Sequence, residues 1–168
     1  MISNPRKNNR SFFIVIGLIV ILGIFFRFYN LDKKTYWHDE AYTSLRVAGY
    51  NGDVVVENVF QGQIIEPKDL LKYQKVTPEI DWRVALARFI EHPEHPPLYY
   101  LGLRFWQEIF GSSVTISRAF SAVLSLLVFP AIFWLCWELF RSTIVGWIAV
   151  AMVAISPFHI IYAQEARQ

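Results

Sequence analysis

Two adjacent carboxylates, Asp39 and Glu40, follow the first long apolar run by about ten residues. A carboxylate can act as a general base toward a hydroxyl group or as a ligand of a divalent cation. The aromatic residues Tyr36, Trp37 and Tyr42 flank the pair, and an aromatic wall would raise a carboxylate pKa toward neutrality by lowering the local dielectric constant. The alternative is an ordinary solvated loop face. The pattern makes Asp39 and Glu40 the candidate catalytic residues, and Asp39 also a candidate metal ligand.

A second cluster occupies residues 91–97, where the sequence reads Glu-His-Pro-Glu-His-Pro-Pro. Its two histidines are three residues apart with acids beside them, a combination that can bind a metal ion. The prolines prevent a regular helix, so the helical His-Glu-x-x-His zinc motif is excluded. We favour a rigid turn that directs His95 toward the site.

Charged residues also stand at the ends of the later apolar runs. Arg118 opens the second run, and Glu165 and Arg167 follow the third. A guanidinium can hold a phosphate through two parallel hydrogen bonds, which makes Arg118 and Arg167 candidate phosphate ligands. Glu165 is a candidate ligand of a metal ion or of a sugar-phosphate head group. The alternatives are snorkelling of Arg118 to the membrane interface and a polar interfacial collar at Glu165 and Arg167.

Three apolar runs must position these groups. The sequence is 54% hydrophobic with a mean hydropathy of +0.31, and the excess over a soluble domain is concentrated in blocks. The blocks predict transmembrane helices at 12–29, 118–140 and 143–162. Basic residues within 1–11 place the N-terminus in the cytoplasm, and Arg27 is expected to snorkel to the interface. Pro157 is expected to kink or end the third helix.

The polar stretch 30–117 is the expected first extracytoplasmic loop, with short juxtamembrane helices. Residues 97–110 are apolar but too short to span, since about 17 residues are needed, and Arg104, Gln107 and Glu108 form one polar stripe. We expect an interfacial helix there. The turn 141–142 is cytoplasmic because of Arg141, and 163–168 begins a second extracytoplasmic loop. The predicted fold is all-α, with three transmembrane helices in the plasma (inner) membrane.

Composition excludes other classes. The net charge is only +2, and the sequence has no basic stripe, zinc-finger spacing or glycine-rich phosphate loop, so no nucleic-acid partner is expected. The single cysteine, Cys136, lies in an apolar run and cannot form an internal disulfide.

The order of the motifs resembles the N-terminal third of bacterial GT-C glycosyltransferases, the relatives of protein O-mannosyltransferases and aminoarabinose transferases (glycosyltransferase family 39-like). The resemblance rests on segments that follow the first span in order: Trp37-His38-Asp39-Glu40-Ala41, His95-Pro96-Pro97-Leu98-Tyr99-Tyr100, Ser117-Arg118-Ala119, and then Ser156-Pro157 with Tyr162-Ala163-Gln164-Glu165-Ala166-Arg167. It implies the start of a GT-C fold and a site facing the periplasm. There, a sugar passes from a polyprenyl-phosphate carrier to a glycan, lipid or protein acceptor, normally with inversion at the anomeric carbon.

The resemblance also implies residue roles. Asp39 would be the base on the acceptor hydroxyl and Glu40 would support it. Arg118 would steady the donor phosphate, with His95 shaping the pocket. Glu165 would help to bind a divalent metal ion or the donor head group. Relatives usually have many more spans, so we expect these 168 residues to be part of a longer protein and inactive alone.

Two other functions stay open from the residues themselves. One is a non-catalytic membrane subunit of envelope polysaccharide assembly. The other is a membrane metallohydrolase that uses His38, Asp39, His92 and His95.

Overall fold

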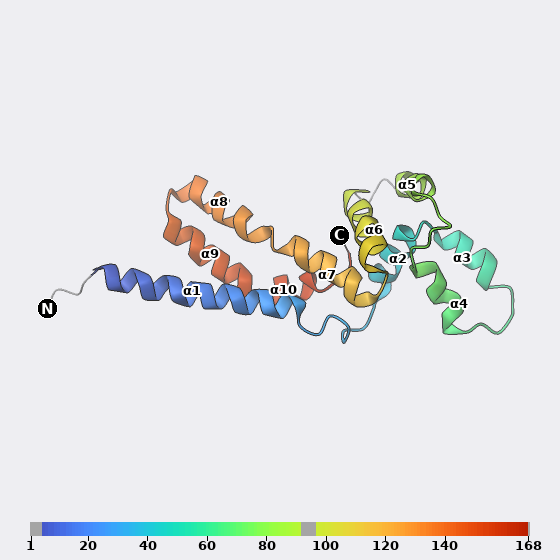
Figure 1. Ribbon diagram of the computed structural model, residues 1–168, viewed down its shortest axis with the longest axis horizontal. Coiled ribbons are helices and arrows are strands. Elements are labelled where there is room, and N and C mark those ends of the chain that lie inside the picture. Colours follow the sequence, from blue (N-terminus) through green and yellow to red (C-terminus); the bar gives the residue numbers. More distant parts are fainter. Residues whose placement is uncertain (1–4, 92–96, 168) are drawn as a thin grey trace. The chain divides into compact units, whose positions relative to one another are not determined.

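The computed structural model describes residues 5–91 and 97–167, and within these ranges it contains helices and no strand. This agrees with the expected all-α class. The helices, shown in Figure 1, are α1 (Pro5–Phe28), α2 (His38–Val47), α3 (Gly52–Val59), α4 (Pro67–Leu71), η1 (Lys72–Gln74), α5 (Trp82–Glu91), α6 (Pro97–Phe110), α7 (Val114–Ser125), α8 (Val128–Phe140), α9 (Thr143–Ile155) and α10 (Pro157–Ala163).

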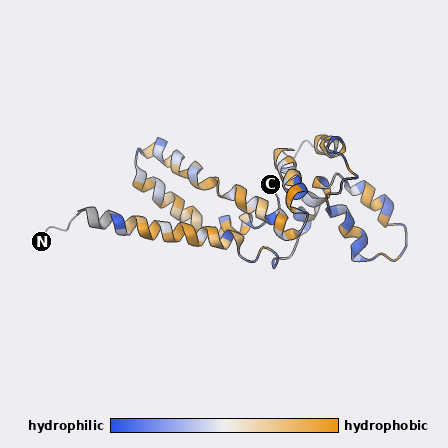
Figure 2. Ribbon diagram, viewed as in Figure 1, coloured by the Kyte–Doolittle hydropathy of each residue, from blue (hydrophilic) through white to orange (hydrophobic). Residues whose placement is uncertain are grey.

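The chain forms two compact units, which we describe separately. The membrane unit comprises Met1–Asn30 and Ser121–Glu165, and the loop unit comprises Leu31–Phe120 and Ala166–Gln168. Figure 2 shows apolar residues along most of α1, whereas the helices of the loop unit mix polar and apolar residues.

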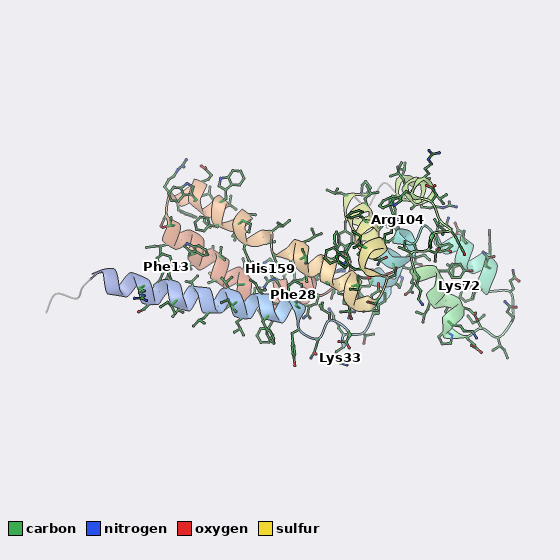
Figure 3. All side chains as sticks on the ribbon, viewed as in Figure 1. Phe13, Phe28, Lys33, Lys72, Arg104 and His159 are labelled. Atoms are coloured by element: carbon green, nitrogen blue, oxygen red, sulfur yellow. The ribbon has the colours of Figure 1, made fainter. Side chains whose placement is uncertain are left out.

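In the part of the chain that the structure describes, two helical stretches are long and apolar enough to cross a membrane, namely Arg10–Phe28 and Val114–Phe140. A third candidate is the pair α9 and α10, which is bent by 61°. The bend falls at Pro157, as expected, because proline disfavours a helical conformation in the residue before it and Ser156 is extended there. Large apolar side chains such as Phe13 are exposed, as lipid-facing residues would be (Figure 3).

The boundary between α7 and α8 also has a local cause. Pro130 cannot donate a hydrogen bond, and its ring crowds the carbonyl of the residue four positions earlier, Leu126. Before the proline, the backbone hydrogen bonds span three residues instead of four: the N–H of Leu126 donates to Val123, and that of Leu127 donates to Leu124. The second candidate span is therefore interrupted at residues 126–127, and its helix begins at Val114 rather than at residue 118.

Arg27 does not snorkel to the interface, contrary to expectation. Its side chain is buried and its guanidinium donates to the carbonyls of Gly23 (2.9 Å), Ala154 (2.8 Å) and Val153 (3.1 Å). The last carbonyls of a helix lack intrahelical partners. Arg27 therefore satisfies the end of α9 at the point where Pro157 breaks the span, and it joins α1 to α9.

The loop unit packs around a small core of Val47, Ala85, Phe89, Tyr100 and Leu103, contributed by α2, α5 and α6. Helix α6 covers the residues for which an interfacial helix was expected. Of the three residues in its expected polar stripe, Glu108 is exposed, whereas Arg104 and Gln107 are not.

Arg104 and Gln107 are buried, with exposed fractions of 1% and 2%. Arg104 donates to the carbonyls of Val47 (2.9 Å) and Ile80 (2.5 Å). This side chain, which is labelled in Figure 3, thus ties α6 to the end of α2 and to the segment that precedes α5 through these two hydrogen bonds.

Candidate functional site

The start of α2 places the two adjacent acids in different environments. Helix α2 begins at His38, so Asp39 and Glu40 lie in its first turn, where negative charge is favoured by the helix dipole. Glu40 folds back and its Oε2 accepts from the backbone N–H of Trp37 at 3.4 Å, as in a capping box. Successive helical residues point about 100° apart. Glu40 therefore faces the interior of the loop unit while Asp39 faces outward.

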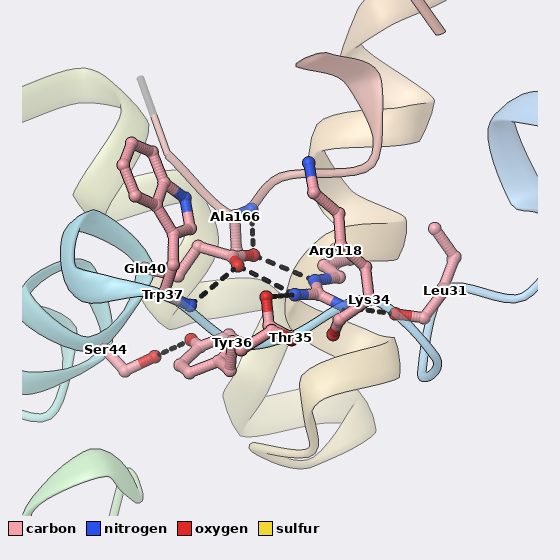
Figure 4. A network of polar contacts seen from close by, with 9 residues as sticks. All are labelled: Leu31, Lys34, Thr35, Tyr36, Trp37, Glu40, Ser44, Arg118 and Ala166. Carbon is pink, nitrogen blue, oxygen red and sulfur yellow. Dashed lines mark hydrogen bonds and ion pairs between the residues drawn. The ribbon is translucent and has the colours of Figure 1, made fainter. Parts of the chain in front are cut away.

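Glu40 and Arg118 form a buried, two-pronged ion pair. The Arg118 Nε donates to Glu40 Oε1 at 2.8 Å, and Nη2 donates to Oε2 at 2.7 Å. Both side chains have no exposed surface. Figure 4 shows the pair at the centre of a polar network.

Backbone groups complete this network. Arg118 also donates to the carbonyls of Leu31 (2.6 Å), Lys34 (2.9 Å) and Thr35 (3.1 Å), so that each of the five N–H groups of its guanidinium has a partner. The backbone N–H of Ala166 donates to Glu40 Oε1 at 2.8 Å. The pair therefore joins residues 31–35, α2, α7 and residue 166 into one assembly.

This geometry bears on two expected roles. A phosphate could bind Arg118 only by displacing several of these buried bonds, so the structure argues against Arg118 as a donor-phosphate ligand. Glu40 likewise has no exposed oxygen to offer an acceptor hydroxyl, which argues against direct catalysis by Glu40. Burial of an ion pair requires such complete hydrogen bonding, because an uncompensated buried charge is costly. Both residues are best described as positioning residues.

Asp39 lies on an open pocket of about 340 Å³, which we call the Asp39 pocket. Its side chain is 45% exposed, and its Oδ2 accepts from Arg167 Nη1 at 2.8 Å. The Arg167 guanidinium also lies 4.9 Å from the centre of the Trp37 ring. The pocket is lined by His38, Asp39, Tyr42, Thr43, Arg46, Tyr100 and Arg167.

The pKa of Asp39 is shifted in the direction opposite to the expected one. The hydrogen bond from Arg167 is the main cause that lowers the pKa of Asp39 below its usual value, and His38 acts in the same direction more weakly. Partial desolvation opposes the shift but does not overcome it. The flanking aromatic residues therefore do not raise this pKa, because a cation is in direct contact with the carboxylate. Asp39 is ionised at neutral pH.

Arg46 is a site residue that sequence reasoning missed. It lines the Asp39 pocket, and its Nη1 donates to the Tyr100 hydroxyl at 3.2 Å. Its position could have been predicted from helical periodicity. One face of a helix contains residues spaced i, i+3, i+4 and i+7, which here are Asp39, Tyr42, Thr43 and Arg46. Among the lining residues that the structure describes, two arginines and one aspartate sum to a formal charge of +1 with histidine counted as neutral, a balance that suits an anionic ligand such as a phosphate.

The structure does not test the remaining expected residues. His95 and His92 lie outside the described residues, so their proposed roles stay predictions. Glu165 is buried and belongs to the membrane unit, whereas Asp39 belongs to the loop unit. Their expected roles as metal ligands also stay predictions. Within residues 5–91 and 97–167, no group of three or more His, Cys, Asp or Glu side chains is arranged to hold a metal ion.

Comparison of the chain with models of protein families, with curated proteins and with solved structures finds no match.

Proposed function

We propose that this chain is part of a membrane glycosyltransferase that transfers a sugar from a polyprenyl-phosphate donor to an acceptor hydroxyl at the extracytoplasmic face of the plasma membrane. The observation that carries the proposal is the Asp39 pocket, in which an accessible, ionised carboxylate lies beside Arg46 and Arg167. The presence of two or three candidate spans supports a lipid-bound donor. The order of the sequence motifs supports the same class.

The reaction needs a base and a group that stabilises the leaving phosphate. The acceptor oxygen attacks the anomeric carbon, and the bond from that carbon to the phosphate oxygen breaks. The acceptor proton passes to an Asp39 carboxylate oxygen, and the polyprenyl phosphate leaves with the bonding electron pair. A weakly basic carboxylate suffices, because the hydroxyl proton becomes acidic as the new bond forms.

Arg46 and Arg167 would hold the donor phosphate in place of Arg118. Charge-assisted hydrogen bonds from guanidinium groups stabilise negative charge that develops on a leaving phosphate. Arg167 is bonded to Asp39 at 2.8 Å in the described structure. A phosphate that recruits Arg167 would weaken this bond and raise the pKa of Asp39, so donor binding would make Asp39 a better base.

A divalent ion is compatible with this pocket. Mg²⁺ is commonly held by one or two carboxylates together with substrate phosphates, and Asp39 is an accessible carboxylate of this kind. Such an ion would add charge stabilisation at the phosphate. The roles proposed for Asp39, Arg46 and Arg167 do not depend on it.

The test is the substitution Asp39→Asn at the native gene locus. Membranes from these cells should transfer a radiolabelled sugar from its polyprenyl-phosphate carrier about 10²–10⁴-fold more slowly, the usual contribution of a general base. Asp53→Asn, which changes an exposed acid outside the Asp39 pocket, is the matched control and should keep full activity. Unchanged transfer in Asp39→Asn would refute the proposal and favour a non-catalytic subunit.

A further inference from the structure

The loop unit contains a second, larger cavity that shares no residue with the Asp39 pocket. Its volume is about 850 Å³, and it lies between residues 75–82 and the second half of α6. We call it the Trp82 cavity. Binding sites for small molecules typically fall between about 300 and 1,000 Å³, so this cavity is large enough for an organic ligand.

The wall of the cavity is held rigidly. Arg104 is 1% exposed, bridges the carbonyls of Val47 and Ile80, and lies 3.2 Å from Glu108 Oε1 through its Nε. Trp82 donates from Nε1 to Glu108 Oε2 at 3.0 Å, and its ring lies 5.2 Å from the Arg104 guanidinium. The indole ring of Trp82 is therefore fixed in orientation while 36% of the residue remains exposed.

Two oxygen atoms at this cavity lack a hydrogen-bond donor. Among the residues that the structure describes, Gln107 Oε1 and Thr77 Oγ1 have no hydrogen-bond partner, and both residues line the cavity. The Gln107 amide is oriented because its Nε2 donates to Ser117 Oγ at 2.8 Å. Buried polar atoms are normally hydrogen-bonded. A ligand that carries hydroxyl groups would supply the missing donors after a small side-chain movement.

The charge of the cavity differs from that of the Asp39 pocket. Lys75 and Arg104 are balanced by Asp81 and Glu108, so the formal charge of the lining residues is zero. An anionic ligand is not favoured over a neutral one. The cavity offers an oriented aromatic ring, carboxylates that accept hydrogen bonds and the exposed Lys75 ammonium group, which donates them. A pyranose ring matches this set, because it has an apolar C–H face and a rim of hydroxyl groups that both donate and accept.

We propose that the Trp82 cavity binds a neutral saccharide unit. Glu108 of this cavity follows Tyr100 of the Asp39 pocket by eight residues on α6, a rise of about 12 Å at ~1.5 Å per residue. The two pockets therefore border the same helix. The saccharide would then be part of a glycan acceptor, an assignment that rests on the proposed function, whereas the binding itself does not.

The experiment measures binding without requiring transfer. The chain in lipid nanodiscs is titrated with neutral trisaccharides of glucose, mannose, galactose and N-acetylglucosamine, and binding is followed by saturation-transfer NMR. At least one trisaccharide should bind with a Kd of about 1 mM or lower. Trp82→Ala should weaken trisaccharide binding at least about tenfold. Glu108→Gln should weaken it by about fivefold, because this variant loses a hydrogen bond to a charged group. Phe60→Ala and Glu57→Gln, which change exposed residues outside the cavity, are the matched controls and should bind normally.

Three results would overturn the proposal. One is the absence of binding by every trisaccharide at about 20 mM. Another is unchanged binding in both Trp82→Ala and Glu108→Gln. The third is equally tight binding of the neutral tripeptide Ala-Ser-Ala or of inorganic phosphate. If Trp82→Ala fails to fold, Glu108→Gln decides, because glutamine keeps the acceptor oxygen for Trp82. Saccharide binding that persists while sugar transfer is absent would refute the proposed function alone.

Discussion

Asp39 and Glu40 are neighbours in the chain but belong to two very different regions. Glu40 lies in a closed network in which its two carboxylate oxygens and all the N–H groups of Arg118 have partners. Asp39 lies in an open pocket beside two arginines. Both residues carry a carboxylate, but that of Glu40 stabilises the fold, whereas that of Asp39 is accessible to a ligand. The difference arises because the two side chains point in different directions from the axis of α2.

The largest expected effect is on the closed network. Arg118→Met leaves Glu40 as a buried charge without its ion partner, which should destabilise the loop unit by about 3–5 kcal/mol. The double variant Glu40→Leu/Arg118→Met removes both charges and should recover much of that loss. Hydrogen exchange of the α2 and α6 amides in detergent measures both. Equal destabilisation in the single and the double variant would show that the charge pairing is not the source of stability.

The next effect concerns the open pocket. Arg46→Gln and Arg167→Gln should each weaken binding of undecaprenyl phosphate in nanodiscs by about tenfold or more, because each removes a charge-assisted hydrogen bond. Arg83→Gln changes an exposed arginine that lines neither pocket and is the control. If the three variants bind alike, the Asp39 pocket does not hold the phosphate.

The smallest effect is a shift in the titration of Asp39. The folded protein holds the pKa of Asp39 below its usual value, chiefly through Arg167. The stabilisation from this contact is thus present above the unfolded pKa and is lost as the pH falls through the folded pKa. Arg167→Gln should raise the pKa of Asp39, and His38→Gln should raise it less. Carboxyl ¹³C NMR, with Asp39→Asn to assign the resonance, measures the shift. A larger rise in His38→Gln would contradict the assigned cause.

Local patterns in the sequence were sufficient to predict several elements. Pro97 and Gly111 bracket α6, and Gly111 adopts the positive φ of +94° that suits glycine after a helix. The bend at Pro157 follows from the covalent structure of proline. Helical periodicity also predicts the face of α2 that carries Asp39 and Arg46.

The arginines could not be assigned in this way. Arg118 bonds to Leu31, 87 residues away in sequence, and Arg27 bonds to Ala154, 127 residues away. Their partners are backbone carbonyls, which carry no sequence signature. From side-chain type alone, Arg27 is expected at the membrane interface and Arg118 at a phosphate. In the structure both are buried and donate to backbone carbonyls.

The division between the two acids is tested most directly by thermal unfolding of Asp39→Asn and Glu40→Gln, measured side by side in the same detergent. Glu40→Gln should lower Tm by about 6 °C or more, because a buried arginine loses its charged partner. Asp39→Asn should leave Tm within about 2 °C of the parent, since an exposed ion pair contributes little. Equal shifts in the two variants, or a larger shift in Asp39→Asn, would contradict the assignment of Glu40 to structure and of Asp39 to chemistry.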